Sequence, residues 1–387
     1  MFKKISQIAS WNILSAFLNF GLNFILARQL GNAFFGEFSI YNAKIALLGL
    51  VFIIVPTNFA VVKFQDDKNF KTIYFSFYIL ASLAFLVILI VAFYIGYVIL
   101  PIYSMFLYSW PLFFISFFDT AFQATNNLKH YFKILFIISF VKLLIFVVVY
   151  YLGLVPNINA VILSVGFGNT LCVLTLIFYY RNSFFSSIKT LETISFVKQN
   201  FSDFRGYYFS TIIKSLADNF FILVFNGVLT KSQLGLFSLF IKAQSFSFSL
   251  FRILEAFLMN RKNNLDYFDK IDAKKYVLGF LLLIITFIIS IIYMYSLSSQ
   301  IYLLESFLIS LCSFSYVSLL IIRSKLLLDY NNKAINFTII LEMCIMFFFQ
   351  NLMKFTNLTS TVSICLCFVL FSSIFRVFFL KFLVSKL

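Results

Sequence analysis

Charged residues are scarce in this sequence. Lys, Arg, Asp and Glu make up 11% of the 387 residues, while 62% of the residues are hydrophobic. Soluble domains carry about a quarter charged residues, so a soluble fold is excluded. The nearly charge-free runs at 73–100, 135–154 and 276–297 are as long as the roughly 20 residues that cross a bilayer as a helix. Barrel strands alternate over about ten residues, so the sequence predicts an all-α polytopic membrane protein.

Metal ligands and nucleotide-binding motifs are also missing. The chain has one histidine, His130, and 5 cysteines without any CxxC pair. A Cys/His metal site is therefore not expected, and the cysteines are interpreted as small buried hydrophobes. The sequence contains no glycine-rich phosphate-binding loop, which argues against direct coupling to ATP. We expect no metal, no cofactor and no catalytic residue, and the protein is not expected to be an enzyme.

One stretch near the start of the chain recurs halfway along it. Residues 25–50 read ILARQLGNAFFGEFSIYNAKIALLGL, and residues 224–250 read VFNGVLTKSQLGLFSLFIKAQSFSFSL. A shift of 199 residues places Leu30, Gly36, Phe38 and Ser39 on Leu229, Gly235, Phe237 and Ser238. Each stretch reads as the end of an apolar helix, a short turn with glycine, and the start of a second helix. Because the shift is close to half the chain, a duplicated architecture is predicted.

About twelve membrane spans are predicted with a ruler of roughly 20 residues per crossing. They fall near 8–28, 38–62, 73–98, 102–125, 134–155, 158–180, 207–229, 234–258, 276–297, 301–322, 334–352 and 361–384. Residues 1–180 and 207–387 are predicted to form two six-helix lobes. Apolar residues recur at helical spacing in 181–206, which predicts an amphipathic linker on the cytoplasmic membrane surface.

The positions of the basic residues predict the orientation of these spans. With a cytoplasmic N-terminus, most of the 30 Lys and Arg residues fall on inner connections. Only Arg28, Lys231 and Lys354 then lie at outer ends, so both termini are predicted to be cytoplasmic. The formal net charge of +16 is therefore interpreted as a topology signal facing anionic membrane lipids, and nucleic acid is not an expected partner.

Charged residues inside spans are costly, which makes each of them a candidate for function. The basic ones are Lys44, Lys142, Lys214, Lys242, Arg252 and Arg376, and the acidic ones are Asp119, Asp218, Glu255, Glu305 and Glu342. For Arg376 and Glu305, pairing or snorkelling is the preferred interpretation. Asp119, Asp218 and Glu342 are the candidates for coupling to a proton or cation. Asp218 also has the spacing for an ion pair with Lys214 on one helix, which stays open as an alternative.

Two predicted spans carry a polar stripe along one helical face. One stripe is Asn12, Ser15, Asn19 and Asn23, and the other is Lys242, Ser245, Ser249, Arg252 and Glu255. Lipid cannot satisfy such a stripe, so it must face protein or water. A central water-filled cavity is predicted, with polar packing between helices and no cavity as the alternative.

The segment ILARQLGNAFFGEFSIY, which follows a first span with polar Ser and Asn, resembles the N-terminal signature of the Wzx-type polysaccharide flippases. The matching residues are Arg28, Leu30, Gly31, Phe35, Gly36, Phe38 and Ser39. These flippases belong to the MOP exporter superfamily, together with the MATE multidrug exporters and the lipid II flippase. The resemblance implies a V-shaped transporter with two six-helix lobes.

The resemblance also implies a cargo and a location. The cargo would be an undecaprenyl-diphosphate-linked oligosaccharide for surface polysaccharide such as O-antigen of lipopolysaccharide, moved across the bacterial inner membrane by alternating access. A proton or cation gradient would drive it, and a polysaccharide polymerase would be a partner. The basic residues Lys44, Lys214, Lys242 and Arg252 are the candidates for binding the diphosphate along a track through the cavity.

Two other functions compete with this interpretation. A MATE-like exporter of cationic drugs would need a cavity of net negative charge, whereas basic residues slightly outnumber acidic ones within the predicted spans. A membrane enzyme of polysaccharide assembly would need a large outer loop or a cluster of catalytic groups, and the predicted outer connections are short and nearly uncharged.

Overall fold

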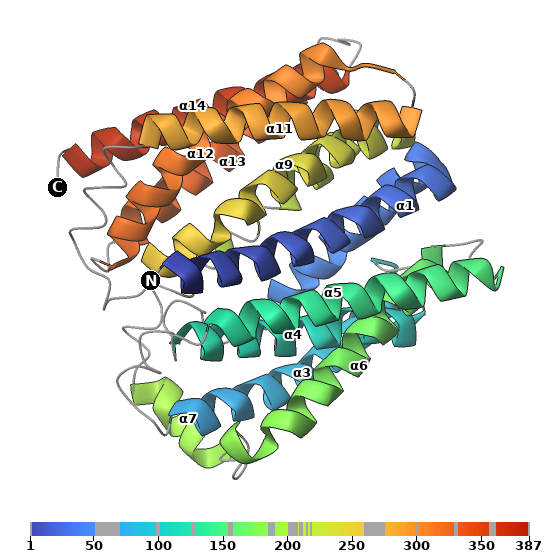
Figure 1. The fold of residues 1–387 in the computed structure, drawn as a ribbon, viewed down its shortest axis with the longest axis vertical. Coiled ribbons are helices and arrows are strands. Elements are labelled where there is room, and N and C mark those ends of the chain that lie inside the picture. Colours follow the sequence, from blue (N-terminus) through green and yellow to red (C-terminus); the bar gives the residue numbers. More distant parts are fainter. Residues whose placement is uncertain are drawn as a thin grey trace. The chain divides into compact units, whose positions relative to one another are not determined.

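The structure is a computed structural model that describes residues 2–50, 70–97, 101–124, 128–153, 158–184, 190–199, 208, 212–213, 216, 219–258, 275–298, 300–328, 332–355 and 361–385. The regular elements in these ranges are all helices (Figure 1). Their bounds are α1 Phe2–Leu50, α3 Phe70–Tyr94, α4 Ile102–Ala124, α5 Leu128–Tyr151, α6 Ile158–Phe184, α7 Thr190–Gln199, α9 Lys231–Leu258, α11 Lys275–Ser298, α12 Leu303–Leu328, α13 Asn332–Phe355 and α14 Val362–Ser385.

Within the described ranges, 8 helices are long and apolar enough to cross a membrane. Their apolar segments are 10–49, 73–94, 132–151, 158–180, 275–297, 303–322, 335–354 and 362–382. The predicted all-helical, multi-pass class is thereby confirmed. Helices α4 and α9 coincide with the predicted spans at 102–125 and 234–258 but are not among the 8. Parts of the spans at 38–62 and 207–229 lie outside the described residues, so the count of twelve spans in two lobes stays a prediction.

Helix α1 is interrupted at the glycine turn that the sequence predicts. Gly31 has φ 79° and ψ 163°, a conformation that only glycine adopts without strain. The helix is kinked at this residue. The second copy of the stretch turns before α9, where Thr230 and Gln233 form a capping box. The Thr230 backbone N–H donates to Gln233 Oε1 at 3.0 Å, and the Gln233 N–H donates to Thr230 Oγ1 at 3.3 Å.

The helices pack into two compact units. One unit contains residues 1–19 and 44–215, and the other contains residues 20–43 and 216–387. Helix α1 therefore contributes residues to both. The predicted lobes, 1–180 and 207–387, and the membrane position of the linker stay predictions. The short helix α7 lies within that linker and packs against α3.

The same order of helix packing occurs in each unit. In the first unit, α4 packs against α3, α5 and α6, and α5 packs against α6. In the second unit, α12 packs against α11, α13 and α14, and α13 packs against α14. A polar contact also recurs at the start of the corresponding helices: the Ser104 hydroxyl donates to Asn159 Oδ1 between α4 and α6, and the Ser363 hydroxyl donates to Glu305 Oε1 between α14 and α12.

The repeated glycines meet where α1 crosses α9 in the second unit. A Cβ atom on Gly36 would lie 2.2 Å from the Lys231 carbonyl oxygen, and one on Gly235 would lie 1.8 Å from the Asn32 carbonyl oxygen. The shift of 199 residues relates Asn32 to Lys231 as it relates Gly36 to Gly235, so the contact is reciprocal. An ion pair between Lys231 Nζ and Glu37 Oε2, at 3.5 Å, borders the crossing. Glycine is needed at both positions because the two backbones touch.

Candidate functional site

Four polar side chains gather between α1 and α5 in the first unit, and we call them the Lys142 cluster: Ser15, Asn19, Ser139 and Lys142. Lys142 Nζ donates to Asn19 Oδ1 at 2.8 Å. Asn19 Nδ2 donates to Ser139 Oγ at 2.7 Å, and the hydroxyls of Ser15 and Ser139 lie 3.0 Å apart. A half-buried ammonium group is thus held by neutral oxygen and amide groups inside two apolar helices.

Helical spacing places the members of the Lys142 cluster on facing sides of the two helices. Ser15 and Asn19 are one turn apart on α1, and Ser139 and Lys142 are three residues apart on α5. The rings of Trp11 and Phe136 extend the same contact, with centroids 5.1 Å apart. The sequence identified the α1 stripe and the charge at position 142. It missed Ser139, although its spacing from Lys142 was the available signal.

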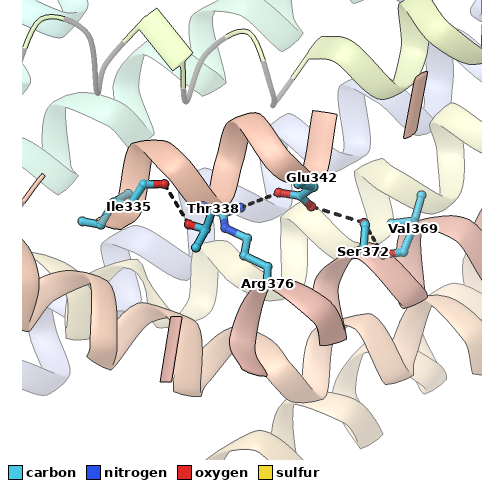
Figure 2. Close-up of polar contacts among 6 residues, drawn as sticks. All are labelled: Ile335, Thr338, Glu342, Val369, Ser372 and Arg376. Atoms are coloured by element: carbon cyan, nitrogen blue, oxygen red, sulfur yellow. Dashed lines mark hydrogen bonds and ion pairs between the residues drawn. The ribbon is translucent and has the colours of Figure 1, made fainter. Parts of the chain in front are cut away.

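A second charged cluster joins α13 to α14 in the second unit, and we call it the Glu342 cluster: Glu342, Ser372 and Arg376 (Figure 2). Arg376 Nη1 lies 3.2 Å from Glu342 Oε2, and the Ser372 hydroxyl donates to Glu342 Oε1 at 3.2 Å. The exposed fractions of the Arg376 and Glu342 side chains are 16% and 6%, so this is a buried ion pair. Pairing was the preferred interpretation of Arg376. The coupling role of Glu342 stays a prediction.

Lys44, the first residue of the predicted basic track, binds the connection that follows α3. Its Nζ donates to the Tyr97 carbonyl oxygen at 3.2 Å and lies 5.1 Å from the centroid of the Tyr97 ring. The ring face and the carbonyl together stabilise the ammonium group. Lys44 is half-buried and belongs to the first unit.

Lys242 is half-buried in α9 and belongs to the second unit. The two serines of its stripe do not bind it, because Ser245 Oγ donates to the Ile241 carbonyl at 2.8 Å and Ser249 Oγ donates to the Phe246 carbonyl at 2.6 Å. Among the side chains that the structure describes, none forms an ion pair or hydrogen bond with Lys242. A cation in such a place is costly, which marks it as a functional candidate.

For the other predicted site residues, the structure describes at most the backbone. Lys214 and Asp218 lie outside the described residues. Arg252 lies on α9 and Asp119 on α4, but their side chains are also outside the described part of the structure. The basic track through a cavity and the role of Asp119, Asp218 and Glu342 in coupling therefore stay predictions.

The acidic side chains that the structure describes are all engaged. Glu37 is paired with Lys231, Glu342 is paired with Arg376, and Glu305 accepts a hydrogen bond from Ser363. Within the described ranges, no group of His, Cys, Asp and Glu side chains is arranged to hold a metal ion. Lys44, Lys142 and Lys242 are half-buried cations for which no carboxylate partner lies among the described side chains, and Lys44 and Lys242 are the two that belong to the predicted basic track.

No family model and no curated protein matches the sequence. Solved structures do match the fold. A mutant of the MATE transporter VcmN from Vibrio cholerae aligns with a TM-score of 0.63 and 10% identity, over 100% of this chain and 99% of that one. A MATE structure in complex with Br-NRF aligns with a TM-score of 0.58 and 10% identity, over 98% and 96%.

A MOP superfamily transporter from Pyrococcus furiosus, whose binding pocket is described as having reverse polarity, aligns with a TM-score of 0.51 and 10% identity, over 99% of this chain and 95% of that one. All three similarities extend over nearly the whole chain. At this level of identity they establish the architecture. The chain has the fold of MATE and MOP superfamily transporters.

Proposed function

We propose that the protein is a membrane transporter for an anionic cargo. The observation that supports this proposal is which charged side chains inside the described helices have a partner of opposite charge. Lys44 and Lys242 are half-buried and have no carboxylate partner among the described side chains, whereas each described carboxylate already has an ion-pair or hydrogen-bond partner. An anionic ligand would supply the missing counter-charge, and a cationic drug would not.

The cargo that we infer is an undecaprenyl-diphosphate-linked oligosaccharide. A diphosphate offers the negative charge that the basic track of Lys44, Lys214, Lys242 and Arg252 would bind. Lysine acts as a mobile point charge that can release phosphate again, whereas Arg252 could hold phosphate oxygens with two donors. The resemblance of residues 25–41 to the polysaccharide flippases supports the same cargo.

The fold supports transport by alternating access. The pocket of reverse polarity in the Pyrococcus furiosus transporter suggests that this architecture accepts more than one sign of charge. In our proposal the protein lies in the bacterial inner membrane with both termini in the cytoplasm. A proton or cation gradient drives it through one or more of Asp119, Asp218 and Glu342, and a polysaccharide polymerase uses the delivered cargo.

A MATE-like, cation-coupled multidrug exporter is the second candidate. The two MATE structures, with TM-scores of 0.63 and 0.58, favour it. In that case the described basic residues would have a structural role, and acidic residues outside the described part would line the pocket. The two candidates differ in the sign of the charge that the cargo carries.

Complementation of a flippase-deficient bacterial strain separates the two. The wild-type chain should restore surface polysaccharide and clear the accumulated lipid-linked repeat units, without lowering the accumulation of ethidium. Lys242→Ala should lose most of the export, and Lys242→Arg should keep it, because the charge is retained.

Lys381→Ala, which removes an exposed lysine near the end of α14, is the matched control. Full export by a Lys242→Ala protein that reaches the membrane would contradict the role of Lys242. Ethidium efflux without complementation would favour the multidrug exporter.

A further inference from the structure

A groove lies between α5 and α6, wholly within the first unit. It has a volume of about 580 Å³. Helix α5 contributes a stripe that includes His130, Lys133, Ile137 and Val141, and α6 contributes a stripe of Leu171, Cys172, Thr175, Leu176, Tyr179 and Tyr180. None of the residues proposed to bind cargo or to couple ions lines it. The groove is therefore separate from the proposed transport site.

The groove exists because the two helices separate along their length. At Gly168, a Cβ atom would lie 3.1 Å from the Lys142 Cα atom, so the backbones are in close contact there. Toward the start of α5 and the end of α6 the helices move apart (Figure 1). The groove occupies this widening stretch. From His130 to Val141 it extends for about 16 Å, at 1.5 Å per helical residue.

The basic residues and the tyrosines of the groove are all at its wide end. Helix α5 begins there and α6 ends there, which brings His130 and Lys133 near Tyr179 and Tyr180. Toward the narrow end the lining is Ile137, Val141, Leu171 and similar residues. Thr175 does not make this part polar, because its hydroxyl donates to the Leu171 carbonyl at 2.8 Å.

The apolar part of the groove opens to the outside of the helix pair. The exposed fractions are 44% for Ile137 and 41% for Leu171, both within segments apolar enough to cross a membrane. An open apolar wall in a membrane-spanning segment faces acyl chains. At the other end, tyrosines next to basic residues are typical of the level of the lipid headgroups. Charge complementarity thus selects an occupant with an anionic head and an apolar tail.

We propose that this groove binds an anionic phospholipid of the surrounding membrane. The phosphate lies at Lys133 and His130, an acyl chain lies along Ile137, Thr175 and Leu171, and the tyrosines lie at the level of the glycerol. Basic pockets between membrane helices bind anionic headgroups in this way. The groove is a resident lipid site and does not depend on which cargo the protein transports.

The test is lipid retention by the purified full-length protein in native mass spectrometry. Phosphatidylglycerol and phosphatidylcholine with identical acyl chains are offered separately in detergent. The wild-type protein should retain phosphatidylglycerol preferentially. Lys133→Ala should weaken that binding about fivefold, as expected for one basic residue at a headgroup, and Lys133→Arg should restore it. Lys275→Ala, at the start of α11, is the matched control for a lysine at a helix start.

A second pair of variants tests the apolar part of the groove. Thr175→Trp places an indole in the groove and should abolish preferential retention. Leu174→Trp adds the same ring to the neighbouring position of α6, which is 50% exposed and does not line the groove. It should retain phosphatidylglycerol as the wild type does.

Equal retention of the two lipids overturns the proposal, as does unchanged retention by both Lys133→Ala and Thr175→Trp. Displacement of phosphatidylglycerol by an equimolar polyprenyl phosphate would also overturn it, since the groove would then hold the lipid carrier of the cargo. Failure of complementation by the wild-type chain would leave this site unaffected and would count against the proposed function alone.

Discussion

Helix α5 of the first unit corresponds to helix α13 of the second. Each carries a charged side chain, and the two charges are stabilised in different ways. Helices α5 and α13 have the same neighbours in their units, and each carries one charge in the middle of an apolar segment, Lys142 in one and Glu342 in the other. Glu342 is stabilised within its own helix pair, by Arg376 and Ser372 of α14. Lys142 instead finds its acceptor on α1, at Asn19.

The residue that faces each charge explains this difference. Where α6 approaches Lys142 it presents Gly168, which allows close backbone contact and offers no side chain. Where α14 approaches Glu342 it presents an arginine and a serine. One unit therefore has an ion pair that is complete within two neighbouring helices. The other has a cation whose stability depends on α1, the helix that contributes residues to both units.

The largest effect should come from removing the arginine of the Glu342 cluster. Arg376→Met leaves a buried carboxylate without its partner and should lower the free energy of unfolding by about 3–5 kcal/mol, measured by denaturant unfolding in detergent micelles. The double variant Glu342→Gln/Arg376→Met should recover most of this loss, because no unpaired charge remains. Lys381→Met, an exposed change on the same helix, is the control. A loss below about 1 kcal/mol for Arg376→Met would show that the pair contributes little.

The reciprocal glycine contact should give the next largest effect. Gly36→Ala and Gly235→Ala each force a Cβ atom into a backbone carbonyl, and each should lower the free energy of unfolding by about 1–3 kcal/mol. Gly21→Ala is the matched control, since a Cβ atom there meets nothing within 4 Å. It should be neutral or stabilising by up to about 1 kcal/mol, because alanine favours helix. Unequal losses at the two crossing glycines would argue against a duplicated contact.

A similar or smaller loss is expected in the Lys142 cluster. Asn19→Ala removes the acceptor of Lys142 and the donor to Ser139, which should lower the free energy of unfolding by about 1–3 kcal/mol. Asn351→Ala serves as the control, because the Asn351 amide is exposed and donates to the Phe347 carbonyl of its own helix. If both variants unfold like the wild type, Lys142 does not depend on α1 and the contrast between the two clusters fails.

The smallest effect is expected for the hydrogen bonds that recur at the starts of corresponding helices. Ser104→Ala should lower the free energy of unfolding by about 0.5–1.5 kcal/mol, and Ser363→Ala slightly more, because its acceptor is the Glu305 carboxylate. Ser245→Ala, whose exposed hydroxyl bonds within α9, should change little. Thermal unfolding of the three variants in one detergent measures the order. A larger effect at Ser104 than at Ser363 would contradict it.

Most of the helices could be predicted from the sequence, because backbone groups in lipid must form their hydrogen bonds within the protein. A backbone without water must bond within its own segment, so apolar runs of sufficient length become helices. The runs at 73–98, 158–180 and 361–384 correspond within a few residues to α3, α6 and α14. The turn at Gly31 could also be predicted from the sequence. The number of spans was not confirmed, because residues 51–69 and most of 207–218 lie outside the described structure.

Much less of the candidate site could be predicted. The cost of charge in lipid identified Lys142, Lys242, Glu342 and Arg376 individually, yet it did not identify their partners. Arg376 and Glu342 are 34 residues apart in the chain, and Lys142 and Asn19 are 123 apart. Such contacts depend on which helices are neighbours and how they are rotated. The periodicity of one helix predicts neither which helix lies next to it nor how the two helices are rotated toward each other.

The sequence by itself determined that this chain is a multi-pass helical membrane protein, where its first helix breaks, and that two of its segments repeat. Those features depend on local composition and spacing. Only the tertiary structure decided that Gly36 and Gly235 touch, that Glu342 pairs with Arg376, and that α5 and α6 separate into a groove with one basic end. The physical reason is that each of these depends on the distance between helices. That distance is set by the side chains of both partners at once.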